Sequence, residues 1–371
     1  MTMALPAGLL QRIPAIIGKK QAAIEYGPVG IDFDAAAIRL VQFRKNDGVV
    51  ELSASAVIPL SDDVPGSIKQ TRALIRKALR RHNFVGRDVV TCLQPKEVKI
   101  IMISFLHQAG KRDEELIVQR VAERVEDNIN NYVIDFLMVR PQVKDRQERS
   151  VLVAMAQREQ VVSHLEHLRK SGLNVKVLEI EPTAIRRLVL MKHGNDHQAN
   201  LMTVSMGYSQ TYITVLSGRR LIYERDISFG EQQLVELLCR ELELDEHEAR
   251  TMLAREQGLT VDISHDEQNV SLTEALYGVL KPLFMELVED INRALVYAAS
   301  ETRGMPVKHI YLTNVVASWR GIENFIDSLI EVPVSVLVPF EGFINSDAVT
   351  ESDPRSAVVT GMALHGLTEV V

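Results

Sequence analysis

Alternating apolar and polar positions near the start of the chain predict a strand, a tight turn and a second strand. In the stretch VGIDFDAAAIRLVQF, residues 29–43, apolar positions lead up to Asp32, and the alternation resumes after a run of alanines. An Asn-Asp-Gly turn at 46–48 favours a hairpin to a third strand, 49–58, because these residues tolerate positive φ. A carboxylate at the end of a buried strand costs free energy unless it is paired or solvated. Asp32 is therefore either a site residue or a turn cap.

A helix with a basic outer face follows and begins at Pro65. Its apolar residues have helical spacing, and the opposite face carries Lys69, Arg72, Arg76, Lys77, Arg80 and Arg81. A solvated helix face is the ordinary explanation of such a run. Contact with an acidic partner or with the inner leaflet of a membrane is the functional alternative.

The next segment predicts a compact α+β unit inserted after the first strands. Its predicted strands are 88–93, 98–105, 133–140, 150–156 and 174–180, and its predicted helices are 113–130 and 158–170. Another helix begins at Glu181-Pro182, since proline suits the first helical position. The polar segment 194–200 is the clearest linker of the chain.

After this linker the opening pattern returns, which indicates an internal duplication. Predicted strands 201–205, 211–217 and 220–228 precede a helix from Glu231, and a long helix, 271–302, comes later. The predicted domains are an N-terminal arm (1–28), a first half (29–86 with 181–193), the inserted unit (88–180) and a second half (199–371).

Composition narrows the function classes. The chain has 371 residues, 46% of them hydrophobic, which is enough for several domains. A net charge of −7 argues against general nucleic-acid binding. Two distant cysteines, and histidine pairs at 164/167 and 193/197 without a third ligand, predict neither a disulfide framework nor a metal site. The N-terminal stretch LPAGLLQRIPAIIGKK is shorter than a spanning helix and fits a flexible arm, a strap or a surface attachment.

Several stretches, taken in their order, resemble a known family. They are VGIDFDAAAIRLVQF, the segment SVLVAMAQREQVVSHLEHLRKSGLNVKVLEIEPTAIRRLV, RRLIYERDISFGEQQL, MELVEDINRALVYAAS and HIYLTNVVASWRGIENFIDSLIEVPVSVLVPF. The chain is similar to the FtsA/PilM branch of actin-like proteins, and within it to the PilM family of type IV pilus assembly proteins. The resemblance implies an α/β fold of duplicated, ribonuclease H-like halves with an inserted α+β subdomain in the first half.

The resemblance also implies a nucleotide cleft, whose first loop departs here from the family pattern. Asp32 stands at the metal-side carboxylate of the family, Asp34 replaces a glycine, and Arg39 takes the place of a lysine. A carboxylate about 4 Å from a phosphate oxygen would repel it by roughly 4 kcal/mol at an effective dielectric constant near 20, although a bound Mg²⁺ could offset this.

The second loop and the adenosine turn depart as well. Gly207 and Ser209 remain in the second loop, but its carboxylate is replaced by Ser205. Consecutive glycines of the family's adenosine turn are replaced by Asn314 and two valines, and β-branched residues resist positive φ. We therefore predict a vestigial nucleotide site with no catalytic residues and no ATP hydrolysis. ATP with Mg²⁺ is the alternative cofactor, in a protein that switches or polymerises with nucleotide, and a sugar or acyl kinase of the same superfold is disfavoured.

The family resemblance implies a membrane partner. It would be the short cytoplasmic N-terminus of a PilN-like, single-span inner-membrane protein, bound in a groove between the first half and the inserted unit. We expect this groove to be walled by the strands of 88–105 and the helix 113–130, with candidate contacts at Val98, Ile100, Met102, Leu116 and Arg120. An assembly ATPase and self-association are further candidate partners. The expected location is the cytoplasm, at the inner membrane through such partners.

Overall fold

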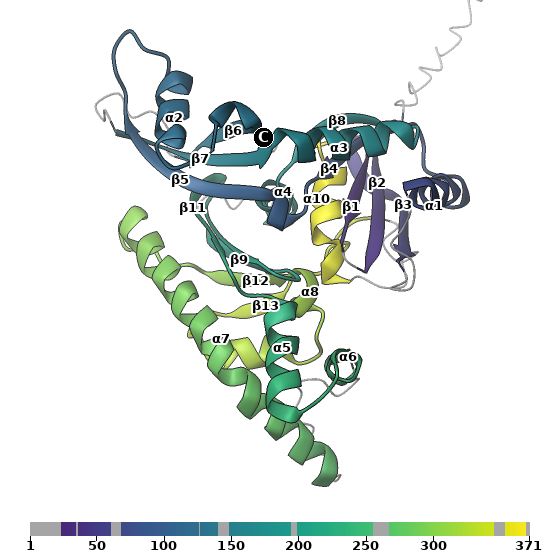
Figure 1. The fold of residues 1–371 in the computed structure, drawn as a ribbon, viewed down its shortest axis with the longest axis vertical. Coiled ribbons are helices and arrows are strands. Elements are labelled where there is room, and N and C mark those ends of the chain that lie inside the picture. Colours follow the sequence, from purple (N-terminus) through teal and green to yellow (C-terminus); the bar gives the residue numbers. More distant parts are fainter. Residues whose placement is uncertain are drawn as a thin grey trace, which may run out of the picture.

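The computed structural model describes residues 24–34, 36–60, 68–125, 127–139, 148–193, 199–254, 267–344 and 353–368. Two five-stranded sheets form the two halves of the molecule, and a three-stranded sheet projects from the first half (Figure 1). The predicted N-terminal arm lies outside the described residues as far as residue 23. Its last residues, from Glu25 on, already belong to the first strand, so the arm is shorter than predicted.

The first sheet has the strand order β3-β2-β1-β4-β8. Strands β1 (Glu25–Phe33), β2 (Ala37–Asn46) and β3 (Val49–Pro59) are antiparallel, whereas β4 (Asp88–Cys92) and β8 (Asn174–Glu179) run parallel to β1. The predicted hairpin turn between β2 and β3 is confirmed, because Asp47 and Gly48 have φ values of 50° and 84°. Helix α1 (Ile68–Arg81) covers one face of this sheet through Ile75 and Leu79.

The second sheet repeats this order as β11-β10-β9-β12-β13. Its strands are β9 (Asn200–Met206), β10 (Thr211–Ser217), β11 (Arg220–Ile227), β12 (His309–Thr313) and β13 (Val334–Val336). The same sequence of three antiparallel and two parallel strands confirms the predicted duplication. The helices of this half are α5 (Glu231–Leu242), α6 (Glu246–Ala254), α7 (Glu267–Glu301), α8 (Asn314–Ala317) and α9 (Ile322–Asp327).

The inserted unit is built on a separate sheet with the order β5-β7-β6. It consists of β5 (Val98–Leu106), α2 (Asp113–Ala122), β6 (Tyr132–Met138), β7 (Glu148–Gln157) and α3 (Arg158–Lys170). Alternate residues of the strands face α2, where Ile103, Ile117 and Val153 form a small core. The other face of the sheet turns toward the first half.

The predicted boundaries of the inserted unit, 88–180, are too wide. Strands β4 and β8, placed by the prediction in that unit, are hydrogen-bonded into the first sheet beside β1. Val89 and Val90 are both buried although they point to opposite faces, as is usual for parallel strands covered on both sides. Such a continuous apolar run carries no signal of the sheet to which it belongs.

The C-terminal segment also belongs elsewhere than predicted. Helix α10 (Ala357–Ala363) packs against β1 and against α4 (Glu181–His193), so it is part of the first half although the prediction assigned 199–371 to the second (Figure 1). Two glycines permit this close contact. A Cβ atom at Gly361 would lie 2.0 Å from the Ala184 carbonyl oxygen, and one at Gly30 would lie 2.4 Å from the Val359 carbonyl oxygen. Asp353 caps the approach to α10 as predicted, accepting a hydrogen bond from the Arg355 amide at 2.9 Å.

Candidate functional site

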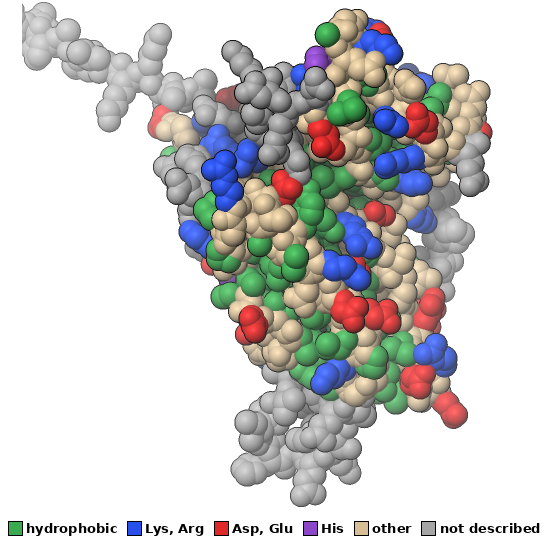
Figure 2. Space-filling view, turned by 90° about the vertical axis from the view of Figure 1, so that its left-hand side faces the viewer, with side chains coloured by type: hydrophobic (Ala, Val, Ile, Leu, Met, Phe, Trp, Pro, Cys, Tyr) green, Lys and Arg blue, Asp and Glu red, His purple; other side chains and the backbone are tan. Residues whose placement is uncertain are grey.

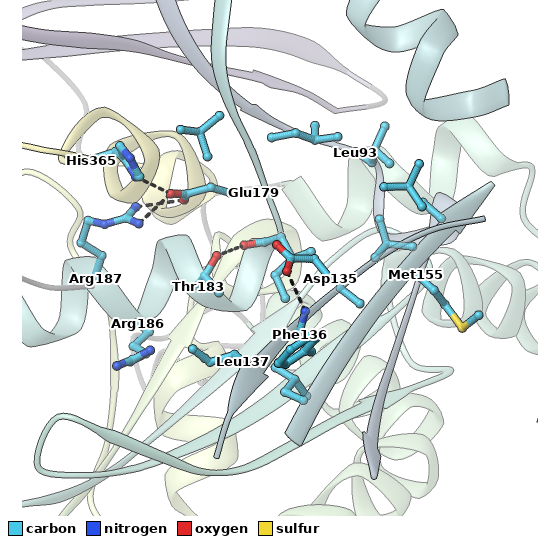
Figure 3. Close-up of a pocket in the computed structure, with 18 of the residues that line it drawn as sticks. Leu93, Asp135, Phe136, Leu137, Met155, Glu179, Thr183, Arg186, Arg187 and His365 are labelled. Atoms are coloured by element: carbon cyan, nitrogen blue, oxygen red, sulfur yellow. Dashed lines mark hydrogen bonds and ion pairs between the residues drawn. The ribbon is translucent and has the colours of Figure 1, made fainter. Parts of the chain in front are cut away.

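A cavity of about 610 Å³ lies between the edges of two sheets (Figure 3). Consecutive residues of β6 and of β8 line it, so an edge of each strand, and not only one face, is turned toward the cavity. In the described part of the chain β6 pairs only with β7, and β8 only with β4. The volume falls in the range of about 300–1,000 Å³ that is typical of ligand sites. The lining is Leu93, Val98, Val133, Asp135, Phe136, Leu137, Leu152, Ala154, Met155, Ala156, Val161, Val177, Leu178, Glu179, Ile180, Thr183, Arg186, Arg187, His365, Gly366 and Thr368.

The middle of the cavity is apolar because of the alternation of β7. Leu152, Ala154 and Ala156 line the cavity, whereas Val151 and Val153 point to the other face and pack beneath α2. Helix α2 is therefore separated from the cavity by the sheet. No described residue of this helix, which was predicted to wall the partner groove, lines the cavity.

The five predicted groove residues divide accordingly. Val98 lines the cavity, and Ile100 lies behind it in the core of the first half. Met102 reaches the second half, where its Sδ lies 3.4 Å from the Glu224 backbone nitrogen of β11. Leu116 of α2 is buried between this helix and the sheet, and the exposed Arg120 pairs with Glu123 just after the helix, so neither lies at the cavity.

One end of the cavity is charged. Arg187 of α4 binds both carboxylate oxygens of Glu179, at 2.9 and 2.6 Å, and His365 Nδ1 lies 2.7 Å from the same carboxylate (Figure 3). Arg187 also donates to the Gly361 carbonyl oxygen at 2.8 Å. This cluster joins β8, α4 and the C-terminal segment. The sequence analysis did not predict this cluster. Its sequence signal is weak: Arg187 is a charged residue among the apolar residues of α4.

The predicted nucleotide residues meet at a second place, the junction of the two halves, where the family resemblance implies the nucleotide cleft. At its floor burial raises the pKa of the Glu181 carboxyl to about 7. Glu181 accepts hydrogen bonds from Ser205 and, at 3.1 Å, from Asn314 Nδ2. Burial also raises the pKa of Asp32, whose Oδ1 lies 3.5 Å from the Cys92 thiol. Sequence reasoning treated Glu181 only as a helix start and so missed its place in the cleft.

Asp34 is a turn cap in the first loop. Its Oδ1 accepts hydrogen bonds from the Ala36 and Ala37 amides at 2.7 and 2.6 Å, and its Oδ2 pairs with the buried Arg39. Burial, together with the nearby Arg355, lowers the pKa of Arg39. The loop amides that would cradle a phosphate thus already donate to a side chain of the loop itself.

The backbone amides near the second loop are also already hydrogen-bonded within the protein. The first amides of α5 donate to this loop, Glu231 to the Gly207 carbonyl at 3.1 Å and Gln232 to the Tyr208 carbonyl at 2.8 Å. Free amides at a helix N-terminus commonly bind anions. The carbonyl of Ser209 accepts from Gln233 Nε2 at 3.3 Å, so this residue too is engaged with α5.

The adenosine turn corrects one prediction. Positive φ was expected to fall on β-branched residues, but it falls on Asn314, with φ 75°, and asparagine adopts this conformation readily. Val315 and Val316 continue instead into the short helix α8. The backbone of this turn is therefore compatible with a glycine-like conformation. Its departure from the family lies in the Asn314 side chain, which reaches back to Glu181.

Two duplicated halves, with an α+β unit inserted in the first, define the fold of an actin-like protein. The chain belongs to the family described as type IV pilus assembly protein PilM, whose model matches residues 30–368. It is similar to a solved structure of a PilM-PilN type IV pilus biogenesis complex, with 22% identity, a TM-score of 0.74, and coverage of 92% of this chain and 99% of that one.

More distant likeness extends to other solved structures. One is the ethanolamine utilization protein EutJ from Carboxydothermus hydrogenoformans, with 15% identity, a TM-score of 0.49, and coverage of 92% and 90% of the two chains. Another is MreB5 of Spiroplasma citri bound to AMPPNP, with 11% identity, a TM-score of 0.43, and coverage of 90% and 94%. Among the described helices, none has the length and apolar character needed to cross a membrane.

Proposed function

We propose that this protein is a cytoplasmic scaffold of a type IV pilus or related secretion assembly, held at the inner membrane by a PilN-like protein. The cytoplasmic N-terminal tail of that single-span partner would bind in the cavity between β6 and β8. The observation that carries this proposal is the apolar cavity itself, which lies between two sheet edges that are unpaired in the described part of the chain.

An extended peptide fits such a place for a physical reason. Strand edges offer backbone amides and carbonyls to an added strand, while an apolar lining accepts alternate side chains. Among the solved structures, the similar PilM structure is one described as a complex with PilN. Asp135, an exposed carboxylate of the lining on β6, could pair with a basic residue of a tail, whereas Glu179 is already paired with Arg187.

The scaffold acts without hydrolysing ATP in this proposal. Three observations support that part: the first-loop amides donate to Asp34, the α5 amides donate to the second loop, and Ser205 replaces the second-loop carboxylate. A protein that binds ATP and switches is the second candidate, and the buried carboxyl groups of Asp32 and Glu181 in the cleft favour it. Titration with Mg-ATP decides between them, because a bound ligand raises the melting temperature by mass action. No shift at millimolar nucleotide removes the second candidate, and a saturable shift supports it.

The tail proposal is tested with a labelled peptide and two matched variants. The peptide is the cytoplasmic N-terminal tail of a PilN-like single-span protein from the same organism, and its affinity is measured by fluorescence anisotropy. Val133 lines the cavity and is 37% exposed; Val118 lies on α2, beyond the sheet, and is 41% exposed. Val133→Glu should weaken binding about tenfold or more, the equivalent of about 1.4 kcal/mol, because it places a charge against apolar contacts. Val118→Glu should bind as the wild type does.

The same pair separates the cavity from the predicted groove wall at α2. Loss of binding in Val118→Glu with normal binding in Val133→Glu would show that the tail binds along α2 and that the cavity is not its site. A peptide with the same composition in scrambled order serves as a control for nonspecific apolar binding. Equal affinity for both peptides would also count against the proposal.

A further inference from the structure

Helix α1 has an unusual concentration of one charge. Six of its fourteen residues are basic and none is acidic. Lys69, Lys77, Arg80 and Arg81 are exposed and take part in no ion pair with the described residues. On the opposite side of the molecule, by contrast, basic and acidic side chains lie next to one another (Figure 2). The basic face of α1, defined as these four residues, is therefore a local positive surface on a protein whose net charge is −7.

Apolar side chains are exposed within and beside this face. Leu74 of α1 is 38% exposed, and Val85, four residues after the helix, is 44% exposed. The inner side of the helix is apolar, and its residues Ile75 and Leu79 are buried against the first sheet. Basic groups mixed with exposed apolar groups are typical of surfaces that lie on a lipid headgroup region.

A second, independent observation concerns where the chain enters the fold. Gln42 Nε2 donates to the Gly27 carbonyl oxygen at 2.9 Å and to the Val85 carbonyl oxygen at 2.7 Å, so the start of β1 lies beside the segment that follows α1. The sequence before β1, residues 1–24, contains three basic residues, no acidic one and the apolar stretch LPAGLLQRIPAII. A sequence of basic and apolar composition therefore enters the described fold on the side where α1 ends.

We propose that the basic face of α1 is a binding surface for an anionic phospholipid membrane. Each Lys or Arg that is held near such a surface strengthens binding about fivefold. An acidic protein would satisfy the charge alone. A membrane also accounts for the exposed leucine and valine, and for the composition of the segment that enters beside them.

The position of α1 suits the rest of the molecule. Arg76 donates to the Ser171 carbonyl oxygen at 3.2 Å, at the end of α3, while Val161, near the start of α3, lines the cavity. Val161 and Ser171 are ten residues apart, so the contact between α1 and α3 lies about 15 Å from the cavity along α3. A protein bound through α1 would hold its cavity near the bilayer from which a tail emerges. The placement of the cavity near a membrane-anchored tail rests on the proposed function, whereas membrane binding by α1 does not.

Vesicle flotation of the full chain tests the proposal. The chain should bind phosphatidylcholine vesicles that contain phosphatidylglycerol at about one part in four. Added salt should weaken this binding, because at 0.1 M it screens charges that are more than about 10 Å apart. The triple variant Lys77→Gln, Arg80→Gln, Arg81→Gln should lose affinity on the order of 100-fold, from three contributions of about fivefold each. The control triple Arg240→Gln, Lys281→Gln, Arg293→Gln removes the same charge from exposed sites on α5 and α7 and should bind as the wild type does.

Three results would overturn the proposal: no binding of the wild type to anionic vesicles, equal binding to vesicles of phosphatidylcholine alone, or equal loss in both triple variants. The vesicles contain no protein, so the outcome does not depend on the tail. Val133→Glu should float with anionic vesicles as the wild type does, and this keeps a failure of the cavity proposal apart from a failure of this one.

Discussion

The contact between α10 and α4 depends on a single missing side chain. At Gly361 an added Cβ would lie 2.0 Å from the carbonyl oxygen of Ala184 and 2.4 Å from its carbonyl carbon. Real Cβ atoms essentially never come closer than 3.0 Å to such atoms, so α10 would have to move by about 1 Å. It has little room to do so, because β1 holds its other side, where Gly30 meets Val359.

These distances set the size of the expected effect. Glycine to alanine inside a helix ordinarily stabilises by about 1 kcal/mol through backbone entropy. At Gly361 overpacking against backbone atoms opposes this gain, and overpacking costs about 1–3 kcal/mol or more. Because both sides of α10 are closed, we expect an overpacking cost of about 3–4 kcal/mol, above the usual range. Less the gain of about 1 kcal/mol, Gly361→Ala should lower the free energy of unfolding by about 2–3 kcal/mol. At Gly278 of α7 an added Cβ would meet nothing within 4 Å, so Gly278→Ala should raise it by about 1 kcal/mol.

Urea denaturation followed by circular dichroism measures both variants. The two carry the same chemical change, and the prediction is a difference of sign. If Gly361→Ala is as stable as the wild type, α10 does not pack against α4 as described, and the assignment of the chain end to the first half fails with it. A loss at Gly278 equal to that at Gly361 would show that helix propensity and not packing decides the result.

Two further predictions concern buried charges. Burial raises the pKa of Glu181 from 4.5 to about 7. Between these pH values the folded protein holds a proton that the unfolded chain has released. The free energy of unfolding should therefore fall by up to about 3 kcal/mol as the pH rises from 4.5 to about 7. Urea midpoints measured across it should show this slope in the wild type and lose it in Glu181→Gln; an unchanged slope in the variant would assign the titration to another group. Arg187→Met leaves the buried Glu179 without its bidentate partner and should cost about 3–5 kcal/mol in the same assay. The double variant with Glu179→Gln should recover most of that loss, and no recovery would mean that the arginine acts through its bond to Gly361 alone.

The duplicated strand pattern was predictable because it is local. Alternation and the turn residues around Gly48 and Gly218 specify each hairpin within a few residues, and both halves show them. Sheet membership of β4 and β8 was not predictable in this way. Strands buried on both faces have the same apolar sequence whichever sheet they join. Helix α10 is similar, since all seven of its residues are buried and no polar face indicates where it packs.

The site shows the same division between local and distant information. The departures of Asp34 and Ser205 from the family pattern are visible in the sequence, but the partners that give them a role are not. Asp34 caps its own loop and pairs with Arg39, while Ser205 donates to Glu181 from the other half. The cavity is still harder to predict from the sequence. Its lining residues are spread from Leu93 to Thr368, and they come together only through the way two sheets approach each other.

One helix connects the cleft with the cavity. The ring of Phe33, in the first loop, lies edge-on to His164 and His167 of α3, with ring centroids 5.7 and 6.2 Å apart, and Val161 of the same helix lines the cavity. Burial lowers the pKa of His164 to about 4, so the contact near neutral pH is one between uncharged rings. A displacement of the first loop would therefore reach the cavity through packing of α3 and not through a charge. Since packed elements move as units, occupation of the cleft and occupation of the cavity are coupled only as far as α3 itself can shift.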